Sequence, residues 1–241
     1  MDEDTLLQAR LDRTEREAHA RQQQLERYAA DLREVFKQER SRAQQLRQSY
    51  KATVRALSNA VEARDAYTGK HAERVTAYGI ALAEAIGIDT VGAPGLEFGF
   101  LLHDVGKLAV PDAILFKPDA LSAEEFSLVA RHPEVGAEIL RDVDFLGEGK
   151  LVVRHHHERW DGAGYPDRLA GDAIPLPARV FAVADALDAL TTDRPYRRAT
   201  RFSWAREEIR SNAGSQFDPA VVAAFDTIPD ARLAEIRDAV T

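Results

Sequence analysis

Cysteine is absent from this chain of 241 residues, and methionine occurs once. The lack of thiols excludes disulfides, zinc fingers, iron–sulfur clusters and thiol catalysis, so any metal must be held by nitrogen and oxygen ligands. No apolar run approaches the ~18 residues of a membrane-spanning helix, and the acidic start of the chain is unlike a signal peptide. We therefore expect a cytoplasmic protein with no membrane span.

Positive charge is also scarce, because 40 acidic residues outnumber 32 basic ones and give a formal net charge of -8. A broad nucleic-acid surface normally carries a basic excess, so no nucleic-acid polymer is expected as a partner. A small phosphate ligand remains compatible with this composition if metal ions or a few arginines supply local positive charge.

Glycine and proline are missing from residues 5–51, which are rich in Gln, Glu, Arg and Ala. Apolar residues recur from this segment onward in a three-four alternation, interrupted at Glu39. They are Leu25, Ala29, Leu32, Phe36, Ala43, Leu46, Tyr50 and Leu57. The pattern predicts a long helix that pairs with a second copy of the chain as a coiled coil. The alternative is a lone solvated helix, and the weak pattern before Leu25 allows disorder there.

The rest of the chain is patterned for helices, and alternating Val/Ile/Thr runs typical of strands are almost absent. Helices are expected over residues 60–86, 96–108, 151–158, 175–190, 204–211 and 219–225. A capping box of Ser122 and Glu125 predicts a further helix that ends near His132, where Pro133 starts the next. Gly87 suits a helix C-terminus. The sequence predicts an all-α protein with an N-terminal helical segment (residues 1–53) and one compact domain (residues 54–241).

Six of the seven histidines fall within residues 71–157, which is the first indication of a functional site. Among them, His103 is followed by Asp104, and both come directly after the apolar stretch FGFLL. On a helix, Lys107 would lie on the same side as this pair. An adjacent His-Asp pair is weak evidence for a metal site when taken alone, because ordinary hydrogen bonding also produces it.

Asp185 strengthens that indication, because nearly all its neighbours in VFAVADAL are apolar. A buried carboxylate is unfavourable unless a cation or several donors offset its desolvation. Asp188 lies one turn further on, so two carboxylates share a helix face and would raise each other's pKa. A metal ion would supply the missing positive charge, and the alternative is an arginine such as Arg179 or Arg194.

The candidate metal ligands combine imidazole and carboxylate groups. They are His71, His103, Asp104, His132, His156, His157 and Asp185. Such a set without sulfur suits Fe, Mn, Zn or Co better than Ca or Mg. Seven ligands exceed the needs of one ion with an open position, whereas two ions with one bridging carboxylate fit the count. A two-metal centre generates a hydroxide nucleophile and stabilises both oxygens in phosphoryl transfer, so the residues point to phosphoester hydrolysis.

Three motifs resemble the HD-GYP domain, a compact HD-type helical bundle. They are HDVGK at residues 103–107, HHERWDGAGYP at 156–166 and DALDALTTDRPYR at 185–197, followed by GSQFDP at 214–219. The resemblance covers roughly residues 54–225, and a plain HD-domain phosphohydrolase would lack the GYP segment. HD-GYP proteins are bacterial phosphodiesterases that hydrolyse cyclic di-GMP to pGpG and often on to GMP. The resemblance implies this activity, in second-messenger signalling, through a metal-bridging hydroxide.

The resemblance also implies two metal sites that share one carboxylate. The first takes His71, His103, Asp104 and Asp185, and the second takes Asp104, His132, His156 and His157. Two divalent transition-metal ions are expected, with iron or manganese favoured over zinc or cobalt. A third ion is disfavoured because Tyr67 stands where some members carry a carboxylate.

Further roles are implied for residues outside the ligand set. Lys107 would join Asp104 in the catalytic machinery and offset charge that grows on the scissile phosphate. Alternatively, Lys107 only forms a salt bridge with Asp104 or caps a helix C-terminus. Tyr165 would stack on guanine or hydrogen-bond to it, within a loop shaped by Gly164 and Pro166. Two arginines match positions that grip phosphate or guanine. They are Arg194 and Arg197.

The chain departs from the family at Lys70, Asp119 and Arg168, where glycine is common. Two other functions remain open from the sequence. The domain would be a cyclic di-GMP receptor or docking scaffold without turnover, or an HD hydrolase of another nucleotide, including other cyclic dinucleotides.

Overall fold

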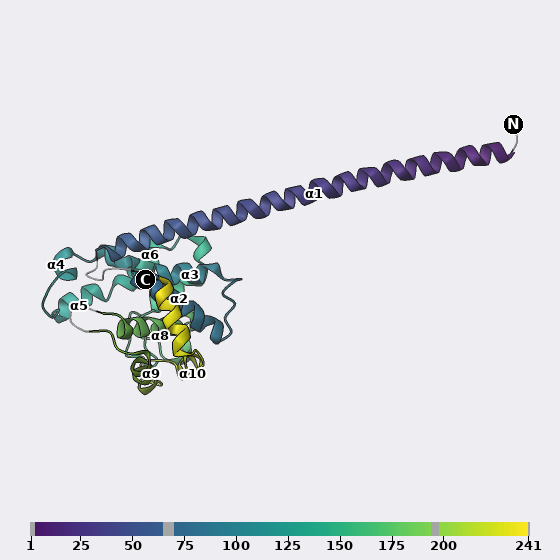
Figure 1. Ribbon diagram of the computed structural model, residues 1–241. Coiled ribbons are helices and arrows are strands. Elements are labelled where there is room, and N and C mark those ends of the chain that lie inside the picture. Colours follow the sequence, from purple (N-terminus) through teal and green to yellow (C-terminus); the bar gives the residue numbers. More distant parts are fainter. Residues whose placement is uncertain (1–2, 65–69, 194–197, 241) are drawn as a thin grey trace. The chain divides into compact units, whose positions relative to one another are not determined.

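A computed structural model describes residues 3–64, 70–193 and 198–240. The helices are α1 (Glu3–Glu62), α2 (His71–Ala85), α3 (Pro94–Leu101), α4 (Asp112–Leu115), α5 (Ala123–Val129), α6 (His132–Ile139), α7 (Gly149–His155), α8 (Leu176–Thr191), α9 (Phe202–Ser211), α10 (Pro219–Asp226) and α11 (Asp230–Val240) (Figure 1). Short 3-10 helices are η1 (Val105–Ala109), η2 (Asp144–Leu146) and η3 (Gly171–Ala173). The described residues contain no strand, so the all-α prediction is confirmed. Among them, no helix combines the length and apolar character that crossing a membrane requires.

By contacts within the chain, residues 1–52 and residues 53–241 form two separate units. The first unit is part of α1, which is helical from Glu3 onward, so disorder before Leu25 is not what the structure shows. Apolar side chains of the predicted seam are exposed, including Leu25, Leu32 and Phe36. The predicted roles of the two segments stay predictions.

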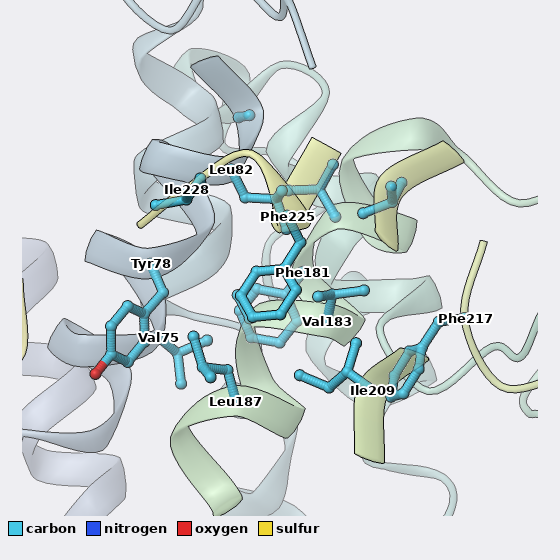
Figure 2. Packing of buried hydrophobic residues seen from close by; sticks show 14 of the residues in the cluster. Val75, Tyr78, Leu82, Phe181, Val183, Leu187, Ile209, Phe217, Phe225 and Ile228 are labelled. Atoms are coloured by element: carbon cyan, nitrogen blue, oxygen red, sulfur yellow. The ribbon is translucent and has the colours of Figure 1, made fainter. Parts of the chain in front are cut away.

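The larger core of the second unit lies between α2 and α8, and helices α9, α10 and α11 contribute to it. On α2, Val75, Tyr78 and Leu82 follow helical spacing and are buried. Phe181 and Leu187 of α8 meet them from the other side (Figure 2). Burying each such side chain contributes roughly 1.5–3 kcal/mol. This core fixes α2 and α8, and each of these helices carries predicted site residues.

A second core cluster surrounds the turn that follows α3. Leu101, Leu102 and Val105 are buried there, packed with Val54 and Val61 of the last turns of α1. The Ser58 hydroxyl donates a hydrogen bond of 2.8 Å to the Leu101 carbonyl. These contacts position the residues on either side of His103 and Asp104.

The helix predicted over residues 96–108 is wrong in its second half. Helix α3 ends at Leu101, and His103 and Asp104 lie in a turn before η1 rather than along a helix. The reason is close packing of η1 against α6: a Cβ added to Gly106 would lie 1.9 Å from the His132 carbonyl oxygen. A straight continuation of α3 would not permit this approach.

The single helix predicted over residues 60–86 is also wrong, because residues 60–62 belong to α1 and α2 starts at His71. Lys70 precedes α2 with a φ of 64°, in the left-handed region. Arg168 likewise has a φ of 54°, which explains why glycine suits these two positions. Asp119 is not among the positive-φ residues, and the structure offers no account of that departure.

Other local predictions are confirmed. Ser122 and Glu125 form the capping box of α5, and α6 begins at His132 with Pro133 in its first turn. Gly87 has a φ of 89° just past α2, as a C-terminal glycine should. The helix predicted over residues 151–158 is shorter than expected, since α7 ends at His155. Helices α4 and α11 were not anticipated.

Candidate metal centre

The carboxylate of Asp104 lies between two groups of histidines. Its Oδ2 is 3.1 Å from His103 Nε2 and 2.8 Å from Lys107 Nζ. Its Oδ1 is 3.2 Å from His132 Nε2 and 3.9 Å from His156 Nε2. The two oxygens of one side chain therefore face different ring nitrogens, which is the geometry that a bridging carboxylate needs.

Three of these rings are oriented by the same local contact. In each, Nδ1 lies close to the carbonyl oxygen three residues earlier: His103 to Phe100 at 3.0 Å, His132 to Val129 at 2.8 Å and His156 to Val153 at 3.0 Å. A carbonyl only accepts hydrogen bonds, so Nδ1 is the donor in every case. In the neutral rings, the lone pair is therefore on Nε2, facing the interior of the site.

The arrangement of these inward-facing Nε2 lone pairs indicates whether the site suits metal ions. His132 Nε2 and His156 Nε2 are 3.1 Å apart, and both lie near an Asp104 oxygen. Burial, together with neighbouring histidines, lowers the pKa of His156 well below its usual range, so the His156 ring stays neutral and its Nε2 is an acceptor. Facing acceptors repel one another unless a cation lies among them. The donor set fits cations that accept imidazole and carboxylate ligands.

His71, the first residue of α2, is oriented by a different contact. Its Nδ1 lies 2.7 Å from Asp188 Oδ2, which leaves Nε2 3.5 Å from Asp185 Oδ1. The Asp188 side chain is 2% exposed and also accepts hydrogen bonds from Arg74 Nε at 2.7 Å and Thr192 Oγ1 at 3.2 Å. A carboxylate behind a ligating histidine is the arrangement that fixes ring orientation at metal sites.

The sequence argument chose the wrong one of the two α8 carboxylates, Asp185 and Asp188, as the buried one. The fully buried one is Asp188, whereas the Asp185 side chain is 34% exposed. The arginine partner of Asp188 is Arg74 of α2, and Arg179 pairs with Asp218 instead. Asp185 and Asp188 are three residues apart and share one side of α8, but Asp188 lies against His71 and Arg74 of α2, whereas Asp185 lies nearer the surface. Arg74 was missed, since nothing in its local sequence marks it.

The structure brings six of the seven predicted ligands into two groups that share Asp104. In each group, one nitrogen or oxygen atom per residue lies within 4.8 Å of the others. The groups are His71, His103 and Asp104, and Asp104, His132, His156 and His157. Asp185 is outside both groups and approaches the site through His71. Arg194 and Arg197 lie outside the described residues, as does Tyr67.

The loop after α7, residues 158–171, which we call the GYP loop, is held against the histidines. Glu158 is buried and accepts hydrogen bonds from the backbone N–H groups of Asp167 and Leu169 at 2.8 and 3.1 Å. Tyr165 stacks on His157, with ring centroids 4.7 Å apart and an angle of 28°. One face of the tyrosine is therefore occupied by a candidate ligand. The peptide bond from Tyr165 to Pro166 is cis.

Two glycines of this loop, Gly162 and Gly164, are subject to different structural constraints. Gly162 has a positive φ, of 76°. Gly164 does not, and is instead packed so closely that a Cβ would lie 2.5 Å from the Arg159 backbone nitrogen. His155, next to the candidate ligands in the sequence, is buried, with Nδ1 3.5 Å from Asp167 Oδ2.

In the metal-free protein, protonation of the predicted ligand His157 disfavours the folded state. Burial, reinforced by the nearby charge of His132, lowers the pKa of His157 to about 3, although Asp104 acts in the opposite direction. An unfolded histidine has a pKa of about 6.5. Between these values, the unfolded chain binds a proton that the folded chain does not, so the free energy of unfolding falls as pH falls.

We therefore predict that metal-free protein has a lower urea midpoint at pH 5.0 than at pH 7.5. The variant His157→Gln should show a smaller pH dependence than the wild type. His71 acts in the opposite direction: burial lowers its pKa, but Asp188 and Asp185 outweigh burial and raise it. That contribution is common to both proteins, so an equal pH dependence in the two would contradict the prediction.

Comparison with known proteins places this centre in a family. The family model described as HD domain matches residues 55–221. The chain is 42% identical over 179 residues to the 3'3'-cGAMP-specific phosphodiesterase 2 of Vibrio cholerae serotype O1, covering 73% of this chain and 34% of the relative. It is 41% identical over 175 residues to the cyclic di-GMP phosphodiesterase response regulator RpfG of Xanthomonas campestris pv. campestris, covering 72% and 46%.

Solved structures show the same fold. A cyclic GMP-AMP specific phosphodiesterase of Vibrio cholerae, V-cGAP3, matches with a TM-score of 0.55 and 19% identity, covering 73% of this chain and 47% of that one. An HDG"Y"P protein of Bdellovibrio bacteriovorus, Bd1817, also matches with a TM-score of 0.55, at 22% identity, covering 75% and 63%.

The chain belongs to the HD-domain family. Within that family it is an HD-GYP protein, as its motifs at residues 103–107 and 156–166 indicated. The chain spans less than half the length of the curated relatives it matches, with a share of 34% and 46% for the two named above.

Proposed function

We propose that this chain is a metal-dependent phosphodiesterase that hydrolyses cyclic di-GMP to pGpG, GMP or both, in bacterial second-messenger signalling. The observation that supports this most is the position of Asp104, which belongs to both groups of candidate ligands and whose two oxygens face different histidines. Two divalent transition-metal ions, iron or manganese, would be held there by the two groups with Asp185. When bound, they supply Lewis acidity and lower the pKa of water. The predicted cytoplasmic location stays a prediction.

In this proposal, side chains of the protein bind the substrate and offset its negative charge. Lys107 Nζ lies 2.8 Å from Asp104 Oδ2, at the edge of the centre, where it can also reach a phosphate oxygen. An ammonium group there stabilises negative charge that develops in the transition state. Tyr165, with Gly164 and Pro166, forms the wall beside His157 and is proposed to contact the nucleotide.

The names of relatives support a cyclic dinucleotide as substrate. Relatives from Xanthomonas campestris, Thermotoga maritima and Pseudomonas aeruginosa, at 40–45% identity, are named cyclic di-GMP phosphodiesterases. A relative at 42% identity is named a 3'3'-cGAMP-specific phosphodiesterase. That similarity favours 3'3'-cGAMP as a second candidate substrate for this chain.

The proposed activity can be tested with protein that is prepared anaerobically. Elemental analysis should find transition metal, and incubation with cyclic di-GMP should yield pGpG or GMP by chromatography. Parallel incubation with 3'3'-cGAMP shows which of the two substrates is hydrolysed faster. Metal-loaded protein that binds cyclic di-GMP by calorimetry but leaves it uncut would instead establish the receptor function.

We predict that Lys107→Met lowers kcat for cyclic di-GMP by about 10²–10³-fold, the usual effect of removing one electrostatic donor. Metal content should stay at the wild-type level, because an ammonium group is not a ligand. Lys150→Met, which removes a lysine that bonds to the Arg141 carbonyl away from the centre, serves as the control. A Lys107→Met enzyme with unchanged kcat would restrict Lys107 to pairing with Asp104.

We further propose that residues 1–52 pair with the same segment of a second copy. The support is the row of exposed apolar side chains at seam positions, with Phe36 73% and Leu32 59% exposed. Sedimentation at micromolar concentration should show a dimer, and Leu32→Lys with Phe36→Lys should convert it to a monomer. The control variant, Gln38→Lys with Gln45→Lys, changes two residues outside the seam and should leave the dimer intact. A wild-type monomer would refute the pairing.

A further inference from the structure

The motif GSQFDP at residues 214–219 forms a turn that is joined to the GYP loop. The backbone N–H of Trp160 donates to the Gln216 carbonyl at 3.1 Å, and that of Asp161 donates to the Ser215 carbonyl at 2.8 Å. The Asn212 carbonyl accepts from the N–H groups of Ser215, Gln216 and Phe217, so the turn is internally braced as well. Two segments about fifty residues apart are thus fixed as one wall.

Residues of this wall line part of a cleft of about 440 Å³, a size typical of small-molecule sites. Its lining includes the candidate metal ligands His156, His157 and Asp185, a group that we call the metal end. The lining also includes three polar residues that are joined by hydrogen bonds of Asn212, namely Glu208, Asn212 and Gln216, a group that we call the polar end. Apolar residues of α8 also line the cleft, including Ala186, Ala189 and Leu190.

The polar end does not suit a phosphate. Its charged side chain is the carboxylate of Glu208, which repels anions. Among the described residues that line the cleft, Arg159 is the one arginine or lysine, and its Nε and Nη2 donate to Asp161 at 3.1 and 2.7 Å. A phosphodiester therefore belongs at the metal end, and a nucleobase attached to it extends over the apolar α8 surface toward Glu208.

Glu208 has the chemistry to select between purines. An ionised carboxylate only accepts hydrogen bonds, so it matches the N1–H and N2–H donors on the Watson–Crick edge of guanine. Adenine presents an acceptor at N1 and would face the carboxylate with repulsion. The Asn212 side-chain nitrogen lies 2.9 Å from the Glu208 carbonyl and 3.4 Å from Glu208 Oε1, which favours holding the carboxylate at this end of the cleft.

Resting on the proposed function, we infer that this cleft receives one guanine base of the cyclic dinucleotide, with Glu208 as the residue that recognises its N1–H and N2–H groups. Gln216 lines the same end and has an amide that can donate to the guanine O6 atom. The apolar α8 residues provide the surface for the face of the base. Specificity for guanine would then depend on a carboxylate in α9, outside the HD and GYP motifs.

The test combines one substitution with one change in the ligand. Dissociation constants and kcat/KM are measured for cyclic di-GMP and for cyclic di-IMP, which lacks the N2 amine, with wild-type protein and Glu208→Gln. Hydrogen bonds to a charged group contribute enough that wild-type protein should favour cyclic di-GMP by about 10-fold or more. Glu208→Gln should bring that preference close to one, and Glu207→Gln, the adjacent exposed residue, should retain it.

Rates on bis(p-nitrophenyl) phosphate, which has no base, correct for differences in folding or metal loading. A preference for cyclic di-GMP that is equal in wild type and Glu208→Gln overturns the inference. Failure of wild-type protein to cleave any cyclic dinucleotide overturns the proposed function instead, and the dissociation constants then still decide whether Glu208 recognises guanine. The two failures are therefore distinguishable.

Discussion

Asp104→Ala is expected to lose metal from both groups of ligands and to lower kcat for cyclic di-GMP at least about a thousandfold. The loss should be larger than for any single histidine, because one side chain serves both groups. Oδ2 faces His103 at 3.1 Å and Oδ1 faces His132 at 3.2 Å. In the proposed chemistry, bound metal ions would supply the nucleophile and stabilise the leaving oxygen, so their loss should remove most of the rate enhancement.

The fold should tolerate this substitution. The Asp104 side chain is 21% exposed, and burial, which alone would raise its pKa, is outweighed by His103 and Lys107, which lower it well below its usual range. Alanine removes the counter-charge of Lys107 but leaves the helices intact.

Elemental analysis, circular dichroism and turnover measured on one preparation would separate metal loss from unfolding. Asp142→Ala is the matched control, since that side chain is 89% exposed and pairs only at 3.5 Å with Arg141. A folded Asp104→Ala protein that keeps both metals would refute the bridging role. One that loses a single metal would show that only one group depends on this carboxylate.

Asp188→Ala is expected to destabilise the domain by about 3–5 kcal/mol, because it leaves the buried Arg74 guanidinium without this partner. Arg74 donates to Asp188 at 2.7 and 3.1 Å, and its side chain is 10% exposed. For a domain of this size, the change corresponds to a fall in Tm of roughly 6–20 °C. His71 also loses the acceptor for Nδ1, so metal affinity should fall by about 10–100-fold.

Thermal unfolding of metal-free protein measures the stability effect apart from metal binding. Thr192→Val removes the weakest of the hydrogen bonds to Asp188, at 3.2 Å, and should lower Tm by only a few degrees. In a double-mutant cycle, Arg74→Met should be less destabilising in the Asp188→Ala background than in the wild type. Additive effects of the two substitutions would show that the pair does not act as a unit.

The candidate ligands were identifiable from residue type and motif, and the reasons given for them were only partly right. Asp185 was singled out because its neighbours in sequence are apolar, yet it is one-third exposed. The same argument applies to Asp188, three residues later, which is the buried carboxylate. A run of apolar neighbours shows that a helix is buried, but which of its faces meets which partner depends on packing.

The sequence by itself determined the helical class, the capping signals and the identity of the imidazole and carboxylate side chains. These follow from interactions within a few residues, such as the capping box of Ser122 and Glu125, and from residue types alone. The N-terminal periodicity likewise predicted α1, although its pairing with another chain stays a prediction.

Only the tertiary structure decided how these groups meet. The contact of Arg74 with Asp188 spans 114 residues of sequence, and that of His71 with Asp188 spans 117. The turn that places Asp104 between two groups of histidines exists because Gly106 lets η1 approach α6. The physical reason is that hydrogen bonds and caps within a helix are set by residue spacing, whereas contacts between helices depend on the packing of the whole core.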